Sequence, residues 1–313
     1  MKIYRFRSAE QTLRIFSSFQ MRLSNPLYFN DKSEFWLDID TKKFAAKWKL
    51  RAILPVMEQH ENDPELRKLH TREEWDAMEH DYNCDTEDFR GTQAGFLAHV
   101  DSSMESVAES SRSEWRSEVS LRFRILSFCR QPNSDRLWAH YADTHKGAAL
   151  CFDTDSMSLP SEWEFQPVKY QDHAPVVSFQ DFDDRKRRDE HLRKTLSIKH
   201  TQWADEDEVR LIAHGGPLDL DGGLFPKFET EMLDVSSGLE KVIFGLDTEY
   251  DFREEVLSRV AKLNEQRQNK IEVLDCYKKT HSVMTIGPFN HSRHGALKCQ
   301  EALKIKKPKQ SVT

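Results

Sequence analysis

The stretch "SDRLWAHYADTHKGAALCF", residues 134–152, predicts a helix, a turn and a strand in close succession. Ser134 or Asp135 can cap a short helix, and "GAALCF" is an apolar run of the length typical of a buried strand. Further strand patterns stand on both sides of this stretch: "KIYRF" at residues 2–6, "RFRILSFC" at 122–129, "EDEVRLIAH" at 206–214, "LEKVIFG" at 239–245 and "KIEVLDCYK" at 270–278. Because few helices separate these strands, we expect an α+β fold with a mixed, mostly antiparallel split sheet and flanking helices.

The charged part of the N-terminal half predicts an insertion in this domain. Between residues 61 and 118, charged side chains alternate with spaced Leu, Trp, Phe and Met, a composition typical of solvated helices. We therefore expect one α+β domain over residues 1–300, with a helical insertion or subdomain at 41–120 and a flexible tail at 301–313. A basic helix is expected over roughly residues 183–202.

Charge and composition limit the classes of partner. The chain has 313 residues and a formal net charge of -7, which argues against a broad basic surface for duplex DNA. Its five cysteines form no Cys-x-x-Cys pair, so reduced thiols are expected rather than a structural zinc site. The N-terminus lacks the apolar core of a signal peptide, and no run reaches membrane-spanning length. We expect a soluble cytoplasmic protein without a membrane partner.

Several motifs follow one another in an order that resembles a known family. "YRF" comes first, "LSNPLYFNDKSEF" follows at residues 23–35, and the blocks Trp-Ala-His-Tyr-Ala…His-Lys-Gly and Trp…Glu-x-Glu-x-Arg come later. This order resembles the uncharacterised bacterial family named domain of unknown function (DUF) 2971, over roughly residues 1–280. The family's Asn-Asp-Pro-Phe-Glu reads Asn-Asp-Lys-Ser-Glu at residues 30–34, which keeps both acidic residues. The resemblance implies no particular activity, so function is argued from the residues.

Two carboxylates and a guanidinium lie in the segment "WADEDEVRLIAH". If the segment is a strand, Glu206, Glu208 and Arg210 share one face of the sheet, because alternate side chains point the same way. In one interpretation, Arg210 neutralises a glutamate in a structural ion pair. In the other, one glutamate faces a cleft walled by Trp203, where it holds a ribose hydroxyl or acts as a base. We expect Glu208 to be the structural partner of Arg210 and Glu206 to be the functional acid.

The helix and turn within residues 134–152 carry the second group of candidate residues. Trp138 and Tyr141 either fill the core or stack on a planar ligand ring. His140 and His145 either bond to backbone carbonyls or, with Lys146 beside them, bind a ligand hydroxyl or phosphate. A metal site is not expected, because two histidines five residues apart do not share a helix face and no third ligand is evident.

The order of these candidates is similar to that in ADP-ribosyltransferases, an analogy at the level of fold alone. Those proteins have a mixed split sheet with an Arg or His on the first strand, aromatics beside the nicotinamide and a Glu on a later strand. Here Arg5 comes first, His140 and Tyr141 follow, and Glu206 or Glu208 comes last. The resemblance implies NAD as the cofactor, with a Glu at the nicotinamide ribose and an Arg at the pyrophosphate. Arg5 could pair either with Glu34 in a salt bridge or with a ligand phosphate. The resemblance also implies a role in bacterial defence or toxicity.

Other classes of function compete with this hypothesis. The acceptor of a transferred group would be a nucleic acid or a protein side chain. A binding or sensor module would recognise a nucleotide-like small molecule or a nucleic acid without turnover. A nuclease would need carboxylates around Mg²⁺, for which Asp31, Glu34, Glu206 and Glu208 are the candidates. In each case we expect Glu206 or Glu208 to lie within side-chain reach of His140 or Tyr141.

Overall fold

The computed structural model describes residues 1–31, 34–40, 92–177, 185–215, 231–278 and 284–305. The chain divides into two compact units: residues 1–32, 120–171 and 199–313 form the first, and residues 33–119 and 172–198 form the second. Of the helical insertion expected at 41–120, residues 41–91 lie outside the described part of the chain.

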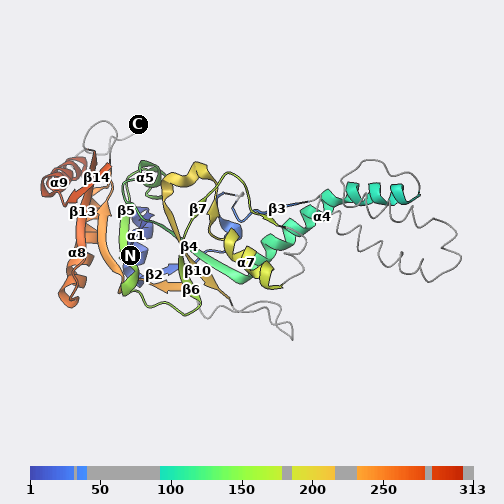
Figure 1. Cartoon of the computed structure of the whole chain (residues 1–313). Coiled ribbons are helices and arrows are strands. Elements are labelled where there is room, and N and C mark those ends of the chain that lie inside the picture. The colour runs from blue at the N-terminus through green and yellow to red at the C-terminus, as the bar shows by residue number, and fades with distance from the viewer. Residues whose placement is uncertain (32–33, 41–91, 178–184, 216–230, 279–283, 306–313) are drawn as a thin grey trace, which may run out of the picture. The chain divides into compact units, whose positions relative to one another are not determined.

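In the described part of the first unit, an eight-stranded sheet provides the framework (Figure 1). Neighbouring strands are antiparallel, except that β12 and β13 run parallel. The strands, in their order across the sheet, are β14 (Met284–Pro288), β13 (Glu272–Lys278), β12 (Leu239–Phe244), β5 (Ala148–Asp153), β1 (Lys2–Arg7), β4 (Phe123–Cys129), β10 (Glu208–His214) and β6 (Trp163–Pro167). This arrangement confirms the predicted α+β fold with a mixed, mostly antiparallel sheet.

The sheet opens between β1 and β4. β1 pairs with β5 at every residue, but its recorded register with β4 is a single pair, Tyr4 opposite Cys129. Further along β4, Ser24 bridges to Ile125 in place of β1. Ser24 follows β2 (Gln20–Arg22), which pairs with β11 (Met232–Asp234) in a separate two-stranded sheet. The two bridges leave a stretch of β4 around Ser127 without a neighbouring strand on the β1 side, and this is the split in the sheet.

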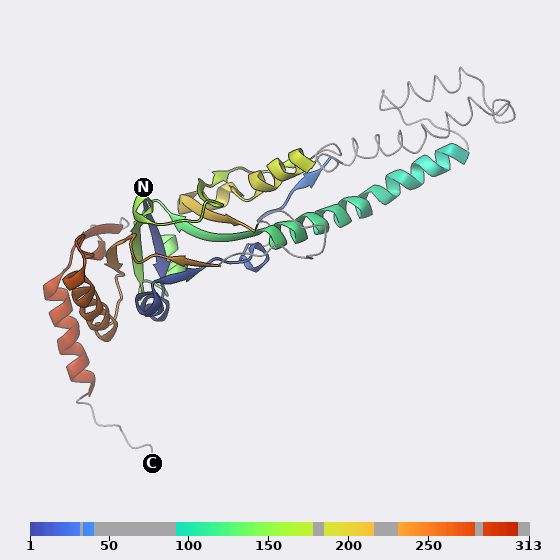
Figure 2. The same ribbon diagram turned by 90° about the horizontal axis from the view of Figure 1, so that it is seen from below.

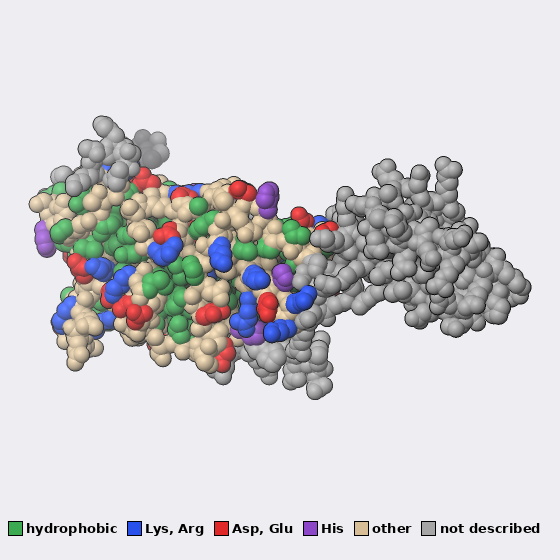
Figure 3. Space-filling model, viewed as in Figure 1, with side chains coloured by type: hydrophobic (Ala, Val, Ile, Leu, Met, Phe, Trp, Pro, Cys, Tyr) green, Lys and Arg blue, Asp and Glu red, His purple; other side chains and the backbone are tan. Residues whose placement is uncertain are grey.

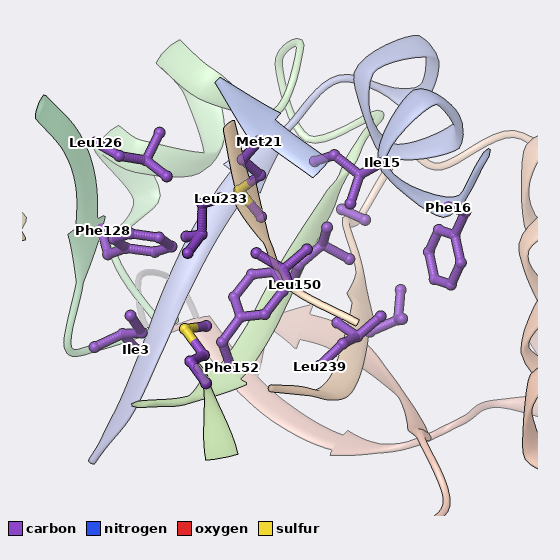
Figure 4. Close-up of a cluster of buried hydrophobic side chains, with 14 of the residues drawn as sticks. Ile3, Ile15, Phe16, Met21, Leu126, Phe128, Leu150, Phe152, Leu233 and Leu239 are labelled. Carbon is purple, nitrogen blue, oxygen red and sulfur yellow. The ribbon is translucent and has the colours of Figure 1, made fainter. Parts of the chain in front are cut away.

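The two faces of the sheet carry separate hydrophobic cores. α1 (Ala9–Ser18) and α8 (Tyr250–Gln266) cover one face, where Ile15 and Phe16 pack with strand residues such as Ile3 and Phe152 (Figure 4). α5 (Asp135–Tyr141) covers the other face, where Trp138 joins a smaller cluster with strand residues. Ser8 caps α1 by accepting a hydrogen bond from the Gln11 backbone.

Strand alternation places the charged residues of β10 on the α5 face. Leu211 and Ala213 belong to the core under α1 and α8. Because successive side chains of a strand point to opposite faces, Glu208 and Arg210 point to the face that α5 covers. The sheet thus brings the two groups of candidate residues onto the same side.

The described part of the second unit is built on α4 (Thr92–Arg122), the last residues of which lead into β4 of the first. α7 (Arg185–Thr195) is tied to α4 by Arg188, whose Nη2 lies 3.0 Å from Glu114 and 2.6 Å from Glu118. The short strands β3 (Asp38–Ile39) and β8 (Val176–Val177) pair in parallel. α4 agrees with the helical character predicted for this region.

The basic helix ends earlier than expected. It is α7, and it stops before residue 202 because the chain turns after it into β9 (Ile198–Lys199) beside β7 (Lys169–Tyr170). The strand at 270–278 is followed by β14 and α9 (His291–Ile305). α9 lies beside α8 (Figure 2) and includes residues 301–305 of the expected tail. The flexibility of that tail stays a prediction, and its remaining residues lie outside the described range.

Candidate functional site

Glu206 does not belong to the strand predicted for it. It ends a 3-10 helix, η4 (Thr201–Glu206), and β10 begins at Glu208. Between them Asp207 has a left-handed backbone with φ 43°, a conformation that Asp tolerates better than most residues. Arg130 pairs with the Asp207 carboxylate, with Nε 2.8 Å from Oδ1. The predicted alternation of three charged residues along one strand is therefore wrong, and Glu208 and Arg210 alone share the strand face.

The two glutamates nevertheless converge on Lys199, a residue that the sequence pattern did not single out. Nζ of Lys199 lies 2.6 Å from Oε2 of Glu206 and 3.0 Å from Oε2 of Glu208. Arg210 also pairs with Glu208, its Nε 2.8 Å from Oε1. All four side chains are buried, Arg210 completely. Charges removed from water are tolerated only when they are paired, and here each carboxylate has a cationic partner.

The surroundings displace the pKa values of the two carboxylates in opposite directions. Burial opposes the ionisation of Glu208, but Arg210 and Lys199 outweigh it and lower its pKa to about 2, with a further contribution from the Ser127 hydroxyl. Burial raises the pKa of Glu206 above its usual range, and Lys199 offsets this in part. Glu208 is therefore ionised at any physiological pH, whereas Glu206 holds its proton to higher pH than an exposed glutamate.

The two shifts predict opposite effects of pH on stability. A carboxyl with a lowered folded pKa stabilises the fold above its usual pKa, and Glu208 loses that contribution as the pH falls from 4.5 to about 2. Glu206 has a raised pKa, so its contribution is largest below its usual pKa of 4.5 and declines as the pH rises through the folded value. We therefore expect the free energy of unfolding of Glu208→Gln to lack the fall between pH 4.5 and about 2. That of Glu206→Gln should lack the decline with rising pH. Identical profiles for both variants and the parent protein would contradict this assignment.

α5 places its large side chains mainly in the core. Ser134 caps the helix by accepting from the Leu137 backbone, as predicted. Trp138 is fully buried, donates from its indole to the Pro132 carbonyl at 2.8 Å and contacts Phe6 edge to face. Packing therefore accounts for Trp138, and its ring has no exposed face for a ligand. Tyr141 is 38% exposed, so its ring remains accessible.

The turn after α5 is left-handed at three successive residues, 143–145, with φ of 48°, 51° and 66°. His145, the last of them, stacks on Trp138 with ring planes 10° apart, whereas His140 and Lys146 are exposed. A Cβ on Gly147 would lie 2.0 Å from the Arg7 carbonyl oxygen. The lack of a side chain at Gly147 thus allows the backbone of β1 to approach closely, and strand packing explains this glycine.

Arg136 joins α5 to η4, and sequence reasoning did not find it. Its Nη1 donates to the Gln202 carbonyl at 2.8 Å and to Asp205 at 3.0 Å. Its guanidinium carbon lies 4.0 Å from the centre of the Trp203 ring, which Lys199 approaches to 5.1 Å. Trp203, expected to wall a cleft, is therefore in contact with two cations of the protein itself. Arg136 thus links the segment at residues 134–152 to the segment around Trp203.

Arg5 reaches the same region from β1. Its Nη1 donates to the Ser127 carbonyl in the split of the sheet, and its Nε is buried without a hydrogen-bond partner in the described structure. Burial and the neighbouring Arg7 lower the pKa of Arg5, while Glu208 and Tyr141 act on it in the opposite sense. Glu208 and Tyr141 thus lie within electrostatic reach of one guanidinium. A direct contact between the glutamates and Tyr141 or His140 stays a prediction.

The candidate Mg²⁺ ligands do not form a cluster in the described part of the chain. No group of three or more His, Cys, Asp and Glu side chains is placed there to hold a metal ion. Asp31 accepts a hydrogen bond from the Trp203 indole at 2.8 Å, and Glu34 belongs to the second unit. Glu206 and Glu208 are engaged by Lys199.

Residues 137–211 match the family described as "Protein of unknown function (DUF2971)". The matched range runs from α5 to β10, so it contains both sequence blocks on which the resemblance most depends. No curated protein and no solved structure matches the chain. Within the described residues, no helix has both the length and the apolar character needed to cross a membrane.

Proposed function

We propose that the protein transfers the ADP-ribosyl group of NAD⁺, with separate roles for its two buried glutamates. One observation carries the proposal: Glu206 and Glu208 share Lys199, yet their pKa values are displaced in opposite directions. Two neighbouring carboxyls whose pKa values are displaced in opposite directions are typical of acid–base catalysts. The ionised Glu208 is suited to stabilise positive charge, and Glu206 is suited to exchange a proton.

The proposed chemistry assigns each glutamate to one event. The bond between ribose C1′ and the nicotinamide nitrogen breaks, and its electron pair leaves with neutral nicotinamide. Positive charge develops on the ribose, where the fixed carboxylate of Glu208 stabilises it. The acceptor then bonds to C1′ and gives its proton to Glu206. Nucleic acid, a protein side chain and water are the acceptors that this chemistry admits.

Release of nicotinamide from NAD⁺ by the purified protein, followed by liquid chromatography, tests this proposal. Gln at position 206 keeps the size of Glu206 but cannot take up a proton, so Glu206→Gln is expected to slow release by about 10²–10⁴-fold. Glu272→Gln is the matched control, because Glu272 also pairs with a lysine at 2.7 Å but is exposed. Absence of release by the parent protein, or equal rates for the parent and Glu206→Gln, would refute the transferase.

A module that binds a nucleotide without turnover is the second candidate. The burial of the two carboxylates favours it: Glu206 is 5% exposed and Glu208 is 4% exposed, and Lys199 lies between them. A catalytic acid has to reach its substrate, and this arrangement leaves little surface for such a contact. The same samples separate the two functions. A rise in melting temperature with NAD⁺ and no release of nicotinamide would favour the binding module.

A further inference from the structure

The two buried glutamates are shielded from water, and η4 forms part of what shields them. Lys199, Glu206 and Glu208 are only 7%, 5% and 4% exposed. The centre of the Trp203 ring, in η4, lies 5.1 Å from the Lys199 amine. A ligand that reaches these side chains therefore has to displace part of the structure around them.

η4 itself is attached to the first unit by few apolar contacts. Four of its six residues are exposed: Thr201, Gln202, Ala204 and Asp205. None of its residues belongs to either of the two hydrophobic cores described above. Hydrogen bonds in a 3-10 helix also have poorer geometry than those in an α-helix. Segments of this kind open locally at a lower free energy than the core around them.

Two side chains from other parts of the first unit hold η4 in place. Arg136 of α5, which lies beside η4 (Figure 1), donates to the Gln202 carbonyl at 2.8 Å and to Asp205 at 3.0 Å. Its guanidinium carbon is 4.0 Å from the centre of the Trp203 ring. Asp31 accepts a hydrogen bond from the same indole at 2.8 Å. These polar and cation–π contacts can break without exposing a hydrophobic core.

The ion pair among these contacts is open to solvent. The side chains of Arg136 and Asp205 are 31% and 50% exposed. Acidic and basic side chains are intermingled over the face shown in Figure 3, and ion pairs in such a setting are screened by water and salt, so each contributes little stability. Lifting η4 away from α5 therefore costs less free energy than separating the strands beneath it.

The backbone marks the point at which η4 ends as a separate segment. Asp207 follows it with a left-handed φ of 43°, and Arg130 of β4 fixes this turn through the Asp207 carbonyl and carboxylate. Glu206 stands on the η4 side of the turn, whereas Glu208 stands on the strand side. If η4 lifts, Glu206 enters water and Lys199 keeps its pair with Glu208. No buried charge is then left unpaired, the situation that makes breaking a buried pair expensive.

We infer that η4 is a lid that opens about Asp207 and is held shut by Arg136. Its opening exposes Lys199 and Glu208, and its closure brings Glu206 back to them. The inference deepens the proposed function and rests on it for the role of Glu206 as the acid. A ligand enters the open state, and closure then completes the catalytic group, as lids do in many enzymes. The motion itself requires no NAD⁺.

The test measures the opening of η4 in the whole protein without a ligand. Amide hydrogen exchange followed by mass spectrometry reports on the backbone bonds of η4, such as that from Trp203 to the His200 carbonyl at 3.0 Å. Brief acetylation of the folded protein reports on the Lys199 amine, with the exposed Lys146 as internal reference. We expect η4 to exchange faster than β5 and β10, because it opens without them.

Arg136→Met should speed both hydrogen exchange in η4 and acetylation of Lys199 by about tenfold, because it removes two hydrogen bonds and a cation–π contact together. Asp205→Ala removes only the exposed ion pair, so it should speed both by about two- to fivefold, and it decides the question if Arg136→Met does not fold. Arg259→Met is the matched control, since Arg259 and Glu255 form a pair that is 32% and 49% exposed. It should leave both rates unchanged.

The outcomes separate the lid from the transferase. Faster exchange in η4 with unchanged exchange in β5 and β10 supports the lid. Faster exchange in all three elements together, or acetylation of Lys199 at the parent rate in both Arg136→Met and Asp205→Ala, overturns it, because η4 would then belong to the rigid framework. A protein whose η4 opens but which releases no nicotinamide keeps the lid and loses the transferase. Release of nicotinamide while η4 exchanges only together with β10 does the reverse.

Discussion

Glu208→Gln is expected to lower the free energy of unfolding by about 3–5 kcal/mol, the range for removing one partner of a buried ion pair. Glu208 is 4% exposed and pairs with both Lys199 and Arg210. The substitution therefore removes a negatively charged partner from each of these two buried cations. An amide oxygen can accept a hydrogen bond but carries no charge. Urea denaturation followed by circular dichroism measures the difference.

Glu206→Gln provides the matched comparison, because the same change is made two residues away against the same lysine. Glu206 pairs with Lys199 alone among the cations recorded near it, and Lys199 keeps Glu208 in the variant. Burial also opposes the charge on Glu206. We therefore expect a change in unfolding free energy below about 1 kcal/mol. An equal loss in both variants would mean that the two glutamates form one structural network, and the division of roles would fail.

The sequence identified the acidic half of this network but not its basic half. Glu206, Glu208 and Arg210 stand together in one segment, so their meeting needs only local structure. Lys199 and Arg136 come from β9 and α5, and their contacts with η4 and β10 depend on how three separate elements pack. A lone Lys before a helix turn and an Arg on a capped helix look like ordinary solvated residues.

Periodicity predicted the strands of the sheet centre well, because they are buried and apolar. "GAALCF" and "LEKVIFG" correspond to β5 and β12 with ends shifted by one residue. The errors lie where a single backbone conformation decides the outcome: Asp207 adopts a left-handed φ and separates Glu206 from β10. β14 was missed because its five residues include a glycine and a proline, which are weak strand formers.

Asp275→Asn is expected to destabilise the protein by about 3–5 kcal/mol as well, through a second buried pair that sequence periodicity gave no reason to expect. Asp275 on β13 is 2% exposed, and its two carboxylate oxygens lie 2.7 Å and 3.0 Å from the guanidinium of Arg253 on α8. The rings of Phe244 and Phe289 contact the same guanidinium at 4.5 Å and 4.9 Å. Asp275 also accepts from the Asn290 backbone at 2.6 Å, just before α9.

Because this pair joins α8, β13 and the start of α9, its loss should loosen all three elements together. Amide hydrogen exchange should therefore speed up across α8 and α9 in Asp275→Asn and in Arg253→Met, ahead of the strands around β5. The double variant Arg253→Met/Asp275→Leu should recover part of the lost stability, because it leaves no unpaired buried charge. Glu272→Gln on the same strand breaks an exposed pair with Lys241 and should change stability by less than about 1 kcal/mol. If the double variant is less stable than the sum of the two single variants predicts, the pair is not the element that holds α8 and α9 to the sheet.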